Sequence, residues 1–400
     1  MKTSEHIDVV AAAPFQDFLF AHENEDEEQL VLRQKDVAGV PAGMAAQQVK
    51  GRRKAKHKLP SWYKTKGIVY PPSLNLEQCS SEDTARFKSS ILEKYKCQRI
   101  VDVTGGFGVD TLAFAGSNKA VTYVEPNSDL LATVRHNHQV LGATTISYLA
   151  TTAEAYLAQS ASPVDAIYID PSRRSNGQKV FRLGDCEPNV VSLQPQLFSL
   201  SRLHLIKTSP LLDIQQGLRE LSSVKEVYVV AVSNECKELL FLCETGFAGE
   251  PLITCVDLSS ADGNGFSFHW SEEQRSVAEQ GPLARYLFEP NAAILKAGAF
   301  KLVGSRSGVA KLDQHTHLYS SDTFVDSFPG RVFEVLEKVK PDKASAKTFP
   351  QGRANVLLRN YPSTVSDLLK KTGLTEGGEL YLIGCSVGKE KLLLKARRLQ

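Results

Sequence analysis

The sequence predicts an α/β protein built around a parallel sheet, with a helical arm before the sheet and small α+β modules after it. Three observations support this fold class. Short apolar runs alternate with helical stretches between residues 99 and 232, which is typical of a parallel sheet with helices on both faces. A glycine-rich turn follows the first apolar run, and beyond residue 280 the rhythm changes to short strands. The 400 residues suffice for two to four domains of roughly 100–200 residues each.

The first 80 residues are expected to form an irregular, mostly helical arm that carries two charged runs. The acidic run Glu23–Glu28 precedes the basic run Lys50–Lys58, in which six of nine residues are Lys or Arg. The basic run is either a solvated helix end or a patch that contacts phosphates. Under the second interpretation, Lys50, Arg52 and Arg53 would bind the substrate.

The central elements follow from capping signals and apolar spacing. Ser80 and Ser81 precede acidic residues and are expected to start a helix, because serine caps free amides and acids suit the helix dipole. Strands are predicted at 99–103, 120–124, 144–149, 164–169, 203–207, 225–232 and 265–270, and helices at 111–115 and 129–141.

The C-terminal part has a different order of elements. A helix is predicted at 290–297, with short strands at 299–303 and 315–319. The last segment is expected to contain strands at 331–338, 354–359, 379–384 and 391–397, with a helix at 363–371.

Composition excludes several classes of protein. With 42% hydrophobic and 23% charged residues, the chain is typical of a globular protein. The net charge is only +2, so any contact with nucleic acid must come from local patches. The seven cysteines are scattered without a CxxC pair, so we expect neither a disulfide framework nor a metal site. No apolar run is long enough for a bilayer and the N-terminus lacks a signal-peptide pattern, so we expect a cytoplasmic protein with no membrane contact.

The first candidate site is the glycine-rich turn at residues 101–110, which joins the first strand to a helix. Glycines there let the backbone approach a ligand that a Cβ atom would block. A dinucleotide would require a third glycine where Thr111 stands. S-adenosylmethionine has no phosphate, and its cationic amine suits Asp102 just before the glycines. Glu125 follows the second strand, where a carboxylate can accept hydrogen bonds from both ribose hydroxyls of either cofactor class.

Asp102-x-x-Gly105-Gly106-x-Gly108, together with Glu125-Pro126-Asn127, resembles the first two motifs of class I S-adenosylmethionine-dependent methyltransferases. The resemblance covers roughly residues 80–270 and implies a Rossmann-like domain. It implies that S-adenosyl-L-methionine is bound by Asp102, Thr104, Gly105, Gly106, Gly108, Asp110, Glu125, Pro126 and Thr152. Thr152 stands where the family often has an Asp that holds the adenine amino group.

Asp170-Pro171-Ser172-Arg173 follows the fourth predicted strand. It resembles the place where methyltransferases of nucleic-acid amino groups carry Asp/Asn-Pro-Pro-Tyr. The resemblance implies that Asp170 and Pro171 face the target amine, and that Arg173 stacks or holds a phosphate in place of the aromatic residue. Alternatively, Asp170 caps a helix and the arginine is solvated. Lys207 ends the next strand at the same edge, where it either contacts the substrate or belongs to a turn.

Asp-Pro-x-Arg is also similar to a motif of RNA 5-methyluridine methyltransferases, which need a nucleophilic cysteine. Cys236 stands near the right place, but its neighbours do not match that family's Ser-Cys-Asn-Pro pattern. We therefore expect Cys236 to pack at the start of a helix.

The C-terminal segments resemble a bacterial methyltransferase family in which a ferredoxin-like module precedes a THUMP-like domain. The resemblance is carried by residues 331–335, 359–362 and 377–383, and by 59–62 and 77–85 near the N-terminus. It implies a helical arm at 1–80, a methyltransferase domain at 81–275, a ferredoxin-like module at 281–328 and a THUMP-like domain at 329–400.

True THUMP domains present RNA to a linked catalytic domain, so the resemblance implies RNA (ribosomal or transfer RNA) as the partner. A second basic cluster at residues 389–398 and Arg359 at a loop are each able to neutralise phosphates. The other interpretation of the cluster is a solvated edge strand, because lysines there prevent edge-to-edge pairing.

These inferences combine into one expected function, the transfer of a methyl group from S-adenosylmethionine to a base amino group in RNA. Alignment of the amine with the methyl group would be the main catalytic effect. One rival is an NAD-dependent oxidoreductase, which the missing third glycine disfavours. Two others stay open: an inactive RNA-binding protein with a methyltransferase fold, favoured by the departures at Ser172, Arg173 and Thr152, and a methyltransferase with a non-RNA substrate.

Overall fold

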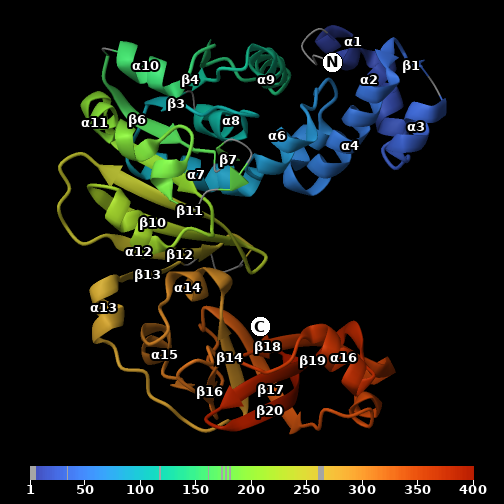
Figure 1. The fold of residues 1–400 in the computed structure, drawn as a ribbon, viewed down its shortest axis with the longest axis vertical. Helices are drawn as coiled ribbons and strands as arrows, with labels where there is room; N and C mark the ends of the chain where they lie inside the picture. The colour runs from blue at the N-terminus through green and yellow to red at the C-terminus, as the bar shows by residue number, and fades with distance from the viewer. Residues whose placement is uncertain are drawn as a thin grey trace. The chain divides into compact units, whose positions relative to one another are not determined.

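A computed structural model describes residues 6–33, 35–116, 119–160, 162–172, 174–175, 178–179, 182–259 and 265–400. The chain divides into two compact units, Met1–Lys225 with Leu239–Gly249 and Glu226–Glu238 with Glu250–Gln400. Figure 1 labels the elements of both units. Among the described residues, no helix combines the length and the apolar character needed to cross a membrane.

The N-terminal arm is helical, as predicted, and shares a core with the sheet that follows. Its elements are α1 (Ile7–Ala11), α2 (Ala13–Ala21), α3 (Glu27–Arg33), β1 (Asp36–Val37), β2 (Val40–Pro41), α4 (Ala42–Lys58), α5 (Pro60–Lys64) and α6 (Ser73–Gln78). Trp62 is fully buried, and its ring centroid lies 4.8 Å from that of Phe107 in the glycine-rich loop. The arm is therefore packed directly behind that loop.

The predicted sheet forms the centre of the first unit, where its strands lie in the order β11-β9-β6-β3-β4-β5. The strands are β3 (Arg99–Asp102), β4 (Ala120–Val124), β5 (Ile146–Leu149), β6 (Val164–Ile169), β9 (Ser201–Thr208) and β11 (Glu235–Glu244). All pair in parallel except β11, which is antiparallel to β9. Because β4 and β6 flank β3 on opposite sides, the carboxyl ends of β3 and β6 form the switch point where open α/β sheets bind ligands.

Helices connect these strands. They are α7 (Glu82–Lys94), α8 (Val109–Ala115), α9 (Ser128–Val140), α10 (Ala153–Gln159), α11 (Val190–Leu200) and α12 (Ile214–Glu220), and a small hairpin of β7 (Arg174–Ser175) and β8 (Gln178–Lys179) follows β6. Helix α7 begins as predicted, because the Ser81 hydroxyl accepts a hydrogen bond from the Thr84 amide at 3.2 Å. Helix α7 packs against α8, which follows the glycine-rich loop.

The second unit contains a seven-stranded sheet in the order β15-β16-β14-β17-β20-β19-β18. Its strands are β14 (Tyr286–Pro290), β15 (Ala310–Lys311), β16 (Tyr319–Ser321), β17 (Gly330–Lys338), β18 (Arg353–Arg359), β19 (Thr375–Val387) and β20 (Glu390–Arg398). The other elements are β10 (Val224–Val232), β12 (Leu252–Asp257), β13 (Phe266–His269), α13 (Trp270–Arg275), α14 (Ala292–Ala297), α15 (Leu302–Ser307) and α16 (Val365–Thr372). Strand β10 pairs in parallel with β12, and β12 pairs antiparallel with β13.

Three local predictions are wrong. The predicted strand at 299–303 leads into helix α15, and the strand predicted at 315–319 is found at 319–321. Cys236 does not start a helix but lies in strand β11, because Ser233 and Asn234 both have positive φ angles and form a tight turn after β10. Two consecutive residues of that kind are the mark of a hairpin turn.

Candidate active site at the sheet edge

The glycine-rich loop closes tightly against its neighbours and leaves one open position. A Cβ atom on Gly105 would lie 2.2 Å from the Tyr123 ring, and one on Gly108 would lie 2.5 Å from Val134. At Gly106, where φ is +52°, the nearest atom to such a Cβ would be the Thr104 carbonyl oxygen at 3.8 Å. Gly105 and Gly108 are thus required for packing, whereas Gly106 is the position at which a ligand can approach the backbone.

Asp102 lies beneath this loop and holds it in place. Its two carboxylate oxygens accept hydrogen bonds from the Thr104 amide at 3.1 Å and from the Thr111 hydroxyl at 2.6 Å. The residue is only 1% exposed. Burial raises the pKa of Asp102 to about 7, and the negative charge of Asp110 acts in the same direction.

Glu125 connects the end of β4 to the same loop. Its carboxylate accepts hydrogen bonds from the Gly106 amide at 3.1 Å and from the Asn127 amide at 2.9 Å. Burial raises the pKa of this half-buried carboxyl, while the two amide bonds oppose the shift. A carboxylate offers about four acceptor sites, so Glu125 keeps capacity for two further donors. Pro126, next to it, is exposed.

The Asp110 side chain is buried in the first unit, where it contacts three other side chains. Its carboxylate lies 3.2 Å from the ammonium of Lys88, whose side chain is fully buried, and accepts hydrogen bonds from Ser80 at 2.8 Å and from Tyr168 at 2.9 Å. Burial alone would raise the pKa of Asp110, but the charges of Lys88 and then Lys207 hold it below its usual value.

Asp170 lies at the end of β6 and is tied to the glycine-rich loop. Its backbone amide donates a hydrogen bond to the Thr104 hydroxyl at 2.7 Å, and its carboxylate forms an ion pair with Lys207. The side chain of Asp170 is 31% exposed and that of Lys207 is 12% exposed. Pro171 is buried beside it. Arg173, which the sequence placed next to the acceptor, lies outside the described residues.

Thr152 follows β5 at the same edge of the sheet. Its hydroxyl caps α10 by accepting a hydrogen bond from the Ala155 amide at 3.2 Å, and the residue is exposed. Strand β5 lies beside β4, since the Glu125 amide donates to the Leu149 carbonyl at 3.1 Å. The residues predicted after β3, β4, β5 and β6 are therefore distributed along one sheet edge.

The two charged runs of the arm pair with each other. Arg52, Arg53 and Lys56 form ion pairs with Glu23 or Glu27 at 3.2–3.5 Å. The Arg52 guanidinium also lies 3.5 Å from the centre of the Phe20 ring and 4.0 Å from that of Tyr63.

The Arg52 side chain is only 4% exposed, so in this structure the residue packs the arm. Its contact with a phosphate stays a prediction. Arg53 and Lys50 are exposed, and Arg53 is paired.

Arg359 also forms an ion pair with a carboxylate, that of Glu289. It lies 2.7 Å from Glu289, whose side chain is fully buried and also forms an ion pair with Arg331. The Arg359 side chain is 34% exposed, so part of the guanidinium faces solvent at the end of β18. Its first role in this structure is to compensate a buried negative charge.

Sequence reasoning missed Lys88, which sets the environment of Asp110. A signal was present, because Lys88 lies three residues after Ala85 and three before Ile91, on the apolar face of α7. A lysine on such a face needs a carboxylate partner in the core. That argument predicts that a partner exists, but it does not identify Asp110.

Comparison with known proteins places this geometry in context. Family models match a ferredoxin-like domain at residues 286–329 and a THUMP domain-like segment at 330–398. An uncharacterised S-adenosylmethionine-dependent methyltransferase of Mycobacterium tuberculosis, found in strains CDC 1551 and H37Rv, is 26% identical over 328 residues, which cover 79% of this chain and 84% of that relative. A crystal structure of a candidate methyltransferase from Porphyromonas gingivalis W83 superimposes with a TM-score of 0.83 at 28% identity, covering 99% of both chains.

The parallel sheet, the glycine-rich loop after β3 and the similarity to solved methyltransferase structures together define the class I methyltransferase fold. The chain contains ferredoxin-like and THUMP domain-like segments, and over most of its length it is similar to S-adenosylmethionine-dependent methyltransferases. These findings agree with the resemblance that the sequence shows and confirm the predicted fold class.

Proposed function

We propose that this protein transfers a methyl group from S-adenosylmethionine to a base amino group in RNA, with residues 81–275 as the catalytic domain. One observation carries the proposal. The hydrogen bond of 2.7 Å from the Asp170 amide to the Thr104 hydroxyl joins the glycine-rich loop after β3 to the carboxylate after β6. The predicted cofactor loop and the predicted acceptor group therefore share the switch point of the sheet.

The residues around the loop fit the cofactor. S-adenosylmethionine supplies a methyl group on a positively charged sulfur. Gly106 offers the open backbone position, and the remaining acceptor sites of Glu125 suit the two ribose hydroxyls. Asp102 orders the loop, and its carboxylate is the group proposed to meet the cofactor's amine.

Asp170 is proposed to act on the acceptor. Its carboxylate would accept a hydrogen bond from the target amine, which aims the nitrogen lone pair at the methyl group. As the nitrogen–carbon bond forms, the sulfur–carbon bond breaks, and the proton released by the amine passes to Asp170 or to water. Lys207 already pairs with this carboxylate, so we assign it the role of positioning Asp170.

RNA is the proposed substrate because the THUMP domain-like segment at 330–398 adds a module of a kind associated with RNA. The exposed lysines Lys389 and Lys391 in that segment are suited to phosphates. Mass spectrometry of RNA nucleosides from a deletion strain and its parent tests this choice. An RNA methyl mark that disappears in the deletion strain supports it, and unchanged RNA would favour a non-RNA substrate or an inactive protein.

Two substitutions separate cofactor binding from transfer. Glu125→Ala should weaken binding of S-adenosylhomocysteine by about 1–3 kcal/mol, because it removes hydrogen bonds to a charged group. Asp170→Ala should keep that affinity within a few-fold of the parent and lose transfer, a loss of roughly 10²–10⁴-fold for a positioned acid or base. Calorimetry and a methyl-transfer assay measure the two effects. Preferential binding of NAD, or loss of cofactor binding in Asp170→Ala, would contradict the assignment.

A further inference from the structure

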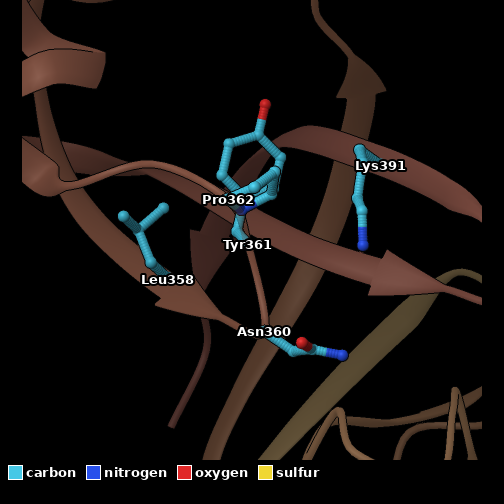
Figure 2. Close-up of a pocket in the computed structure, with 5 residues that line it drawn as sticks. All are labelled: Leu358, Asn360, Tyr361, Pro362 and Lys391. Carbon is cyan, nitrogen blue, oxygen red and sulfur yellow. The ribbon is translucent and has the colours of Figure 1, made fainter.

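The second unit contains a cavity, and the proposed function involves only one of its lining residues, Lys391. It has a volume of about 240 Å³ and is lined by Leu358, Asn360, Tyr361, Pro362 and Lys391 (Figure 2). The first four residues belong to the end of β18 and the turn after it, and Lys391 comes from β20. Strand β19 lies between these two strands, so the cavity opens across one end of the sheet.

An aromatic ring forms one wall of this cavity. Figure 2 shows the Tyr361 ring between Leu358 and Lys391. The ring can take this position because Gly384 in β19 has no side chain, and a Cβ there would lie 2.9 Å from the Tyr361 ring and 2.7 Å from Leu358. Tyr361 is half-buried, and within the described part of the chain its hydroxyl has no hydrogen-bond partner.

A fixed positive charge forms the opposite wall. The Lys391 ammonium donates a hydrogen bond to the Ser386 hydroxyl at 2.6 Å, and that hydroxyl in turn donates to the Asn360 carbonyl. Among the described residues, no carboxylate forms an ion pair with Lys391. The ammonium therefore has two free donors and an uncompensated charge, held at the rim of the cavity.

The side-chain amide of Asn360 is a third polar group in the lining of the cavity. Asn360 adopts the left-handed conformation at φ +52°, which turns the chain sharply after β18 and brings its side chain to the cavity. Its amide nitrogen donates to the Thr316 hydroxyl at 3.3 Å. An aromatic face, an unpaired cation and an amide within one small cavity match a ligand that combines a planar ring, a negative charge and polar ring edges.

We propose that this cavity holds one unpaired nucleotide of the RNA substrate, an inference that rests on the proposed function. The base stacks on Tyr361, the phosphate pairs with Lys391, and Asn360 contacts the base edge. Stacking on an aromatic ring suits any base, so the cavity contributes affinity for single-stranded RNA with little sequence preference.

The test measures binding of a short fluorescein-labelled single-stranded RNA to the full-length protein. Tyr361→Leu keeps an apolar side chain but loses the ring, and should weaken binding by about 5- to 100-fold. Tyr361→Phe keeps the ring and should bind within about 2-fold of the parent, since base–aromatic stacking needs only the π-face. Lys391→Met should flatten the slope of log affinity against log salt by about 0.7, the value for one phosphate contact on a single strand. Lys371→Met, an exposed lysine on α16, is the matched control and should leave both quantities unchanged.

Three further measurements make the outcome decisive. Thermal unfolding of each variant should match that of the parent, which shows that the second unit folds, and S-adenosylhomocysteine, whose proposed site lies in the first unit, should bind all of them equally. Ultraviolet cross-linking of the RNA to the parent should yield a modified peptide that contains Tyr361.

The inference is overturned if the parent binds RNA and Tyr361→Leu and Lys391→Met bind it like Lys371→Met, and the proposed function would then stand. If the parent binds no RNA, both fail. Binding of free AMP or UMP as tightly as RNA would instead assign the cavity to a small molecule.

Discussion

Two lysine–aspartate pairs in the first unit have similar chemistry but different surroundings. In the pair Lys88–Asp110 the lysine side chain is 0% exposed and the aspartate side chain 12%. In the pair Lys207–Asp170 the corresponding values are 12% and 31%. Asp110 lies in the first turn of α8, after the glycine-rich loop, and Asp170 follows the neighbouring strand β6.

Burial decides what each pair can do. Removing one member of a buried pair leaves the other charge in a medium of low dielectric constant, so breaking such a pair destabilises the fold. A partly exposed pair gains little free energy, because water solvates both charges when the pair opens. Asp170 can therefore exchange Lys207 for a substrate amine at small cost, whereas Asp110 cannot leave Lys88. This is why we propose Asp170, and not Asp110, as a group that contacts the substrate.

The largest expected effect is on stability. Asp110→Ala should lower the free energy of unfolding by about 3–5 kcal/mol, because it removes the carboxylate that pairs with the buried Lys88 ammonium. Denaturant unfolding of the full chain measures this change. The matched control is Asp170→Ala, which should cost less than about 1 kcal/mol.

Equal losses of stability in Asp110→Ala and Asp170→Ala would show that burial does not distinguish the two ion pairs, which would contradict this assignment. A double variant, Lys88→Met with Asp110→Ala, adds a second check. It should recover most of the lost stability, because neither charge of this pair is then left in the core.

Local patterns were enough to predict much of the central sheet, and the reasons are physical. Strands 120–124 and 164–169 occur as predicted, because each is an apolar run between turn-forming residues. The predicted strand at 299–303 failed because a short apolar run has no clear period. There the Glu273 carboxylate accepts hydrogen bonds from the amides of Lys301 and Leu302 and so caps α15 from a distant part of the chain.

The candidate site shows the same limit of sequence reasoning. Residue type and position after a strand were sufficient to propose Asp102, Glu125 and Asp170 as candidate site residues, and the structure places all three at the ends of neighbouring strands. They were not sufficient to show that Asp110 pairs with Lys88 or that Arg52 packs between two rings. Those contacts join segments far apart in the sequence, so their energies depend on burial that only the folded chain defines.

Asp102 extends the comparison, because it is buried like Asp110 but has no cation beside it among the described residues. Its raised pKa of about 7 means that the carboxyl is neutral below that pH and charged above it. If the cofactor's amine supplies the missing cation, affinity for S-adenosylhomocysteine should rise by up to about 10-fold per pH unit toward pH 7 and then level off. Calorimetry at several pH values measures this profile.

Asp102→Asn cannot ionise and should give a flat affinity profile. The same pKa affects stability. Because the folded-state pKa lies above the unfolded value of about 3.9, the stabilisation is complete below that value and is lost as the pH rises through about 7. The parent should therefore lose stability over this range relative to Asp102→Asn. A pH profile of affinity that is the same for both proteins would show that Asp102 supports the loop without meeting the amine.

The smallest effects are expected where charged pairs lie at the surface of the arm. Arg53 and Lys56 are already compensated by Glu27 and Glu23, so replacing either by Met should leave the salt slope of RNA binding unchanged. Lys389 in the second unit is exposed and forms no ion pair among the described residues. Lys389→Met should flatten that slope by about 0.7–0.9 if the lysine contacts a phosphate. Salt titrations of RNA binding compare the three variants. An equal flattening of the salt slope in all three variants would mean that RNA displaces the acidic run of the arm when it binds. Ion pairing in the free protein would then not predict which basic residues contact the substrate.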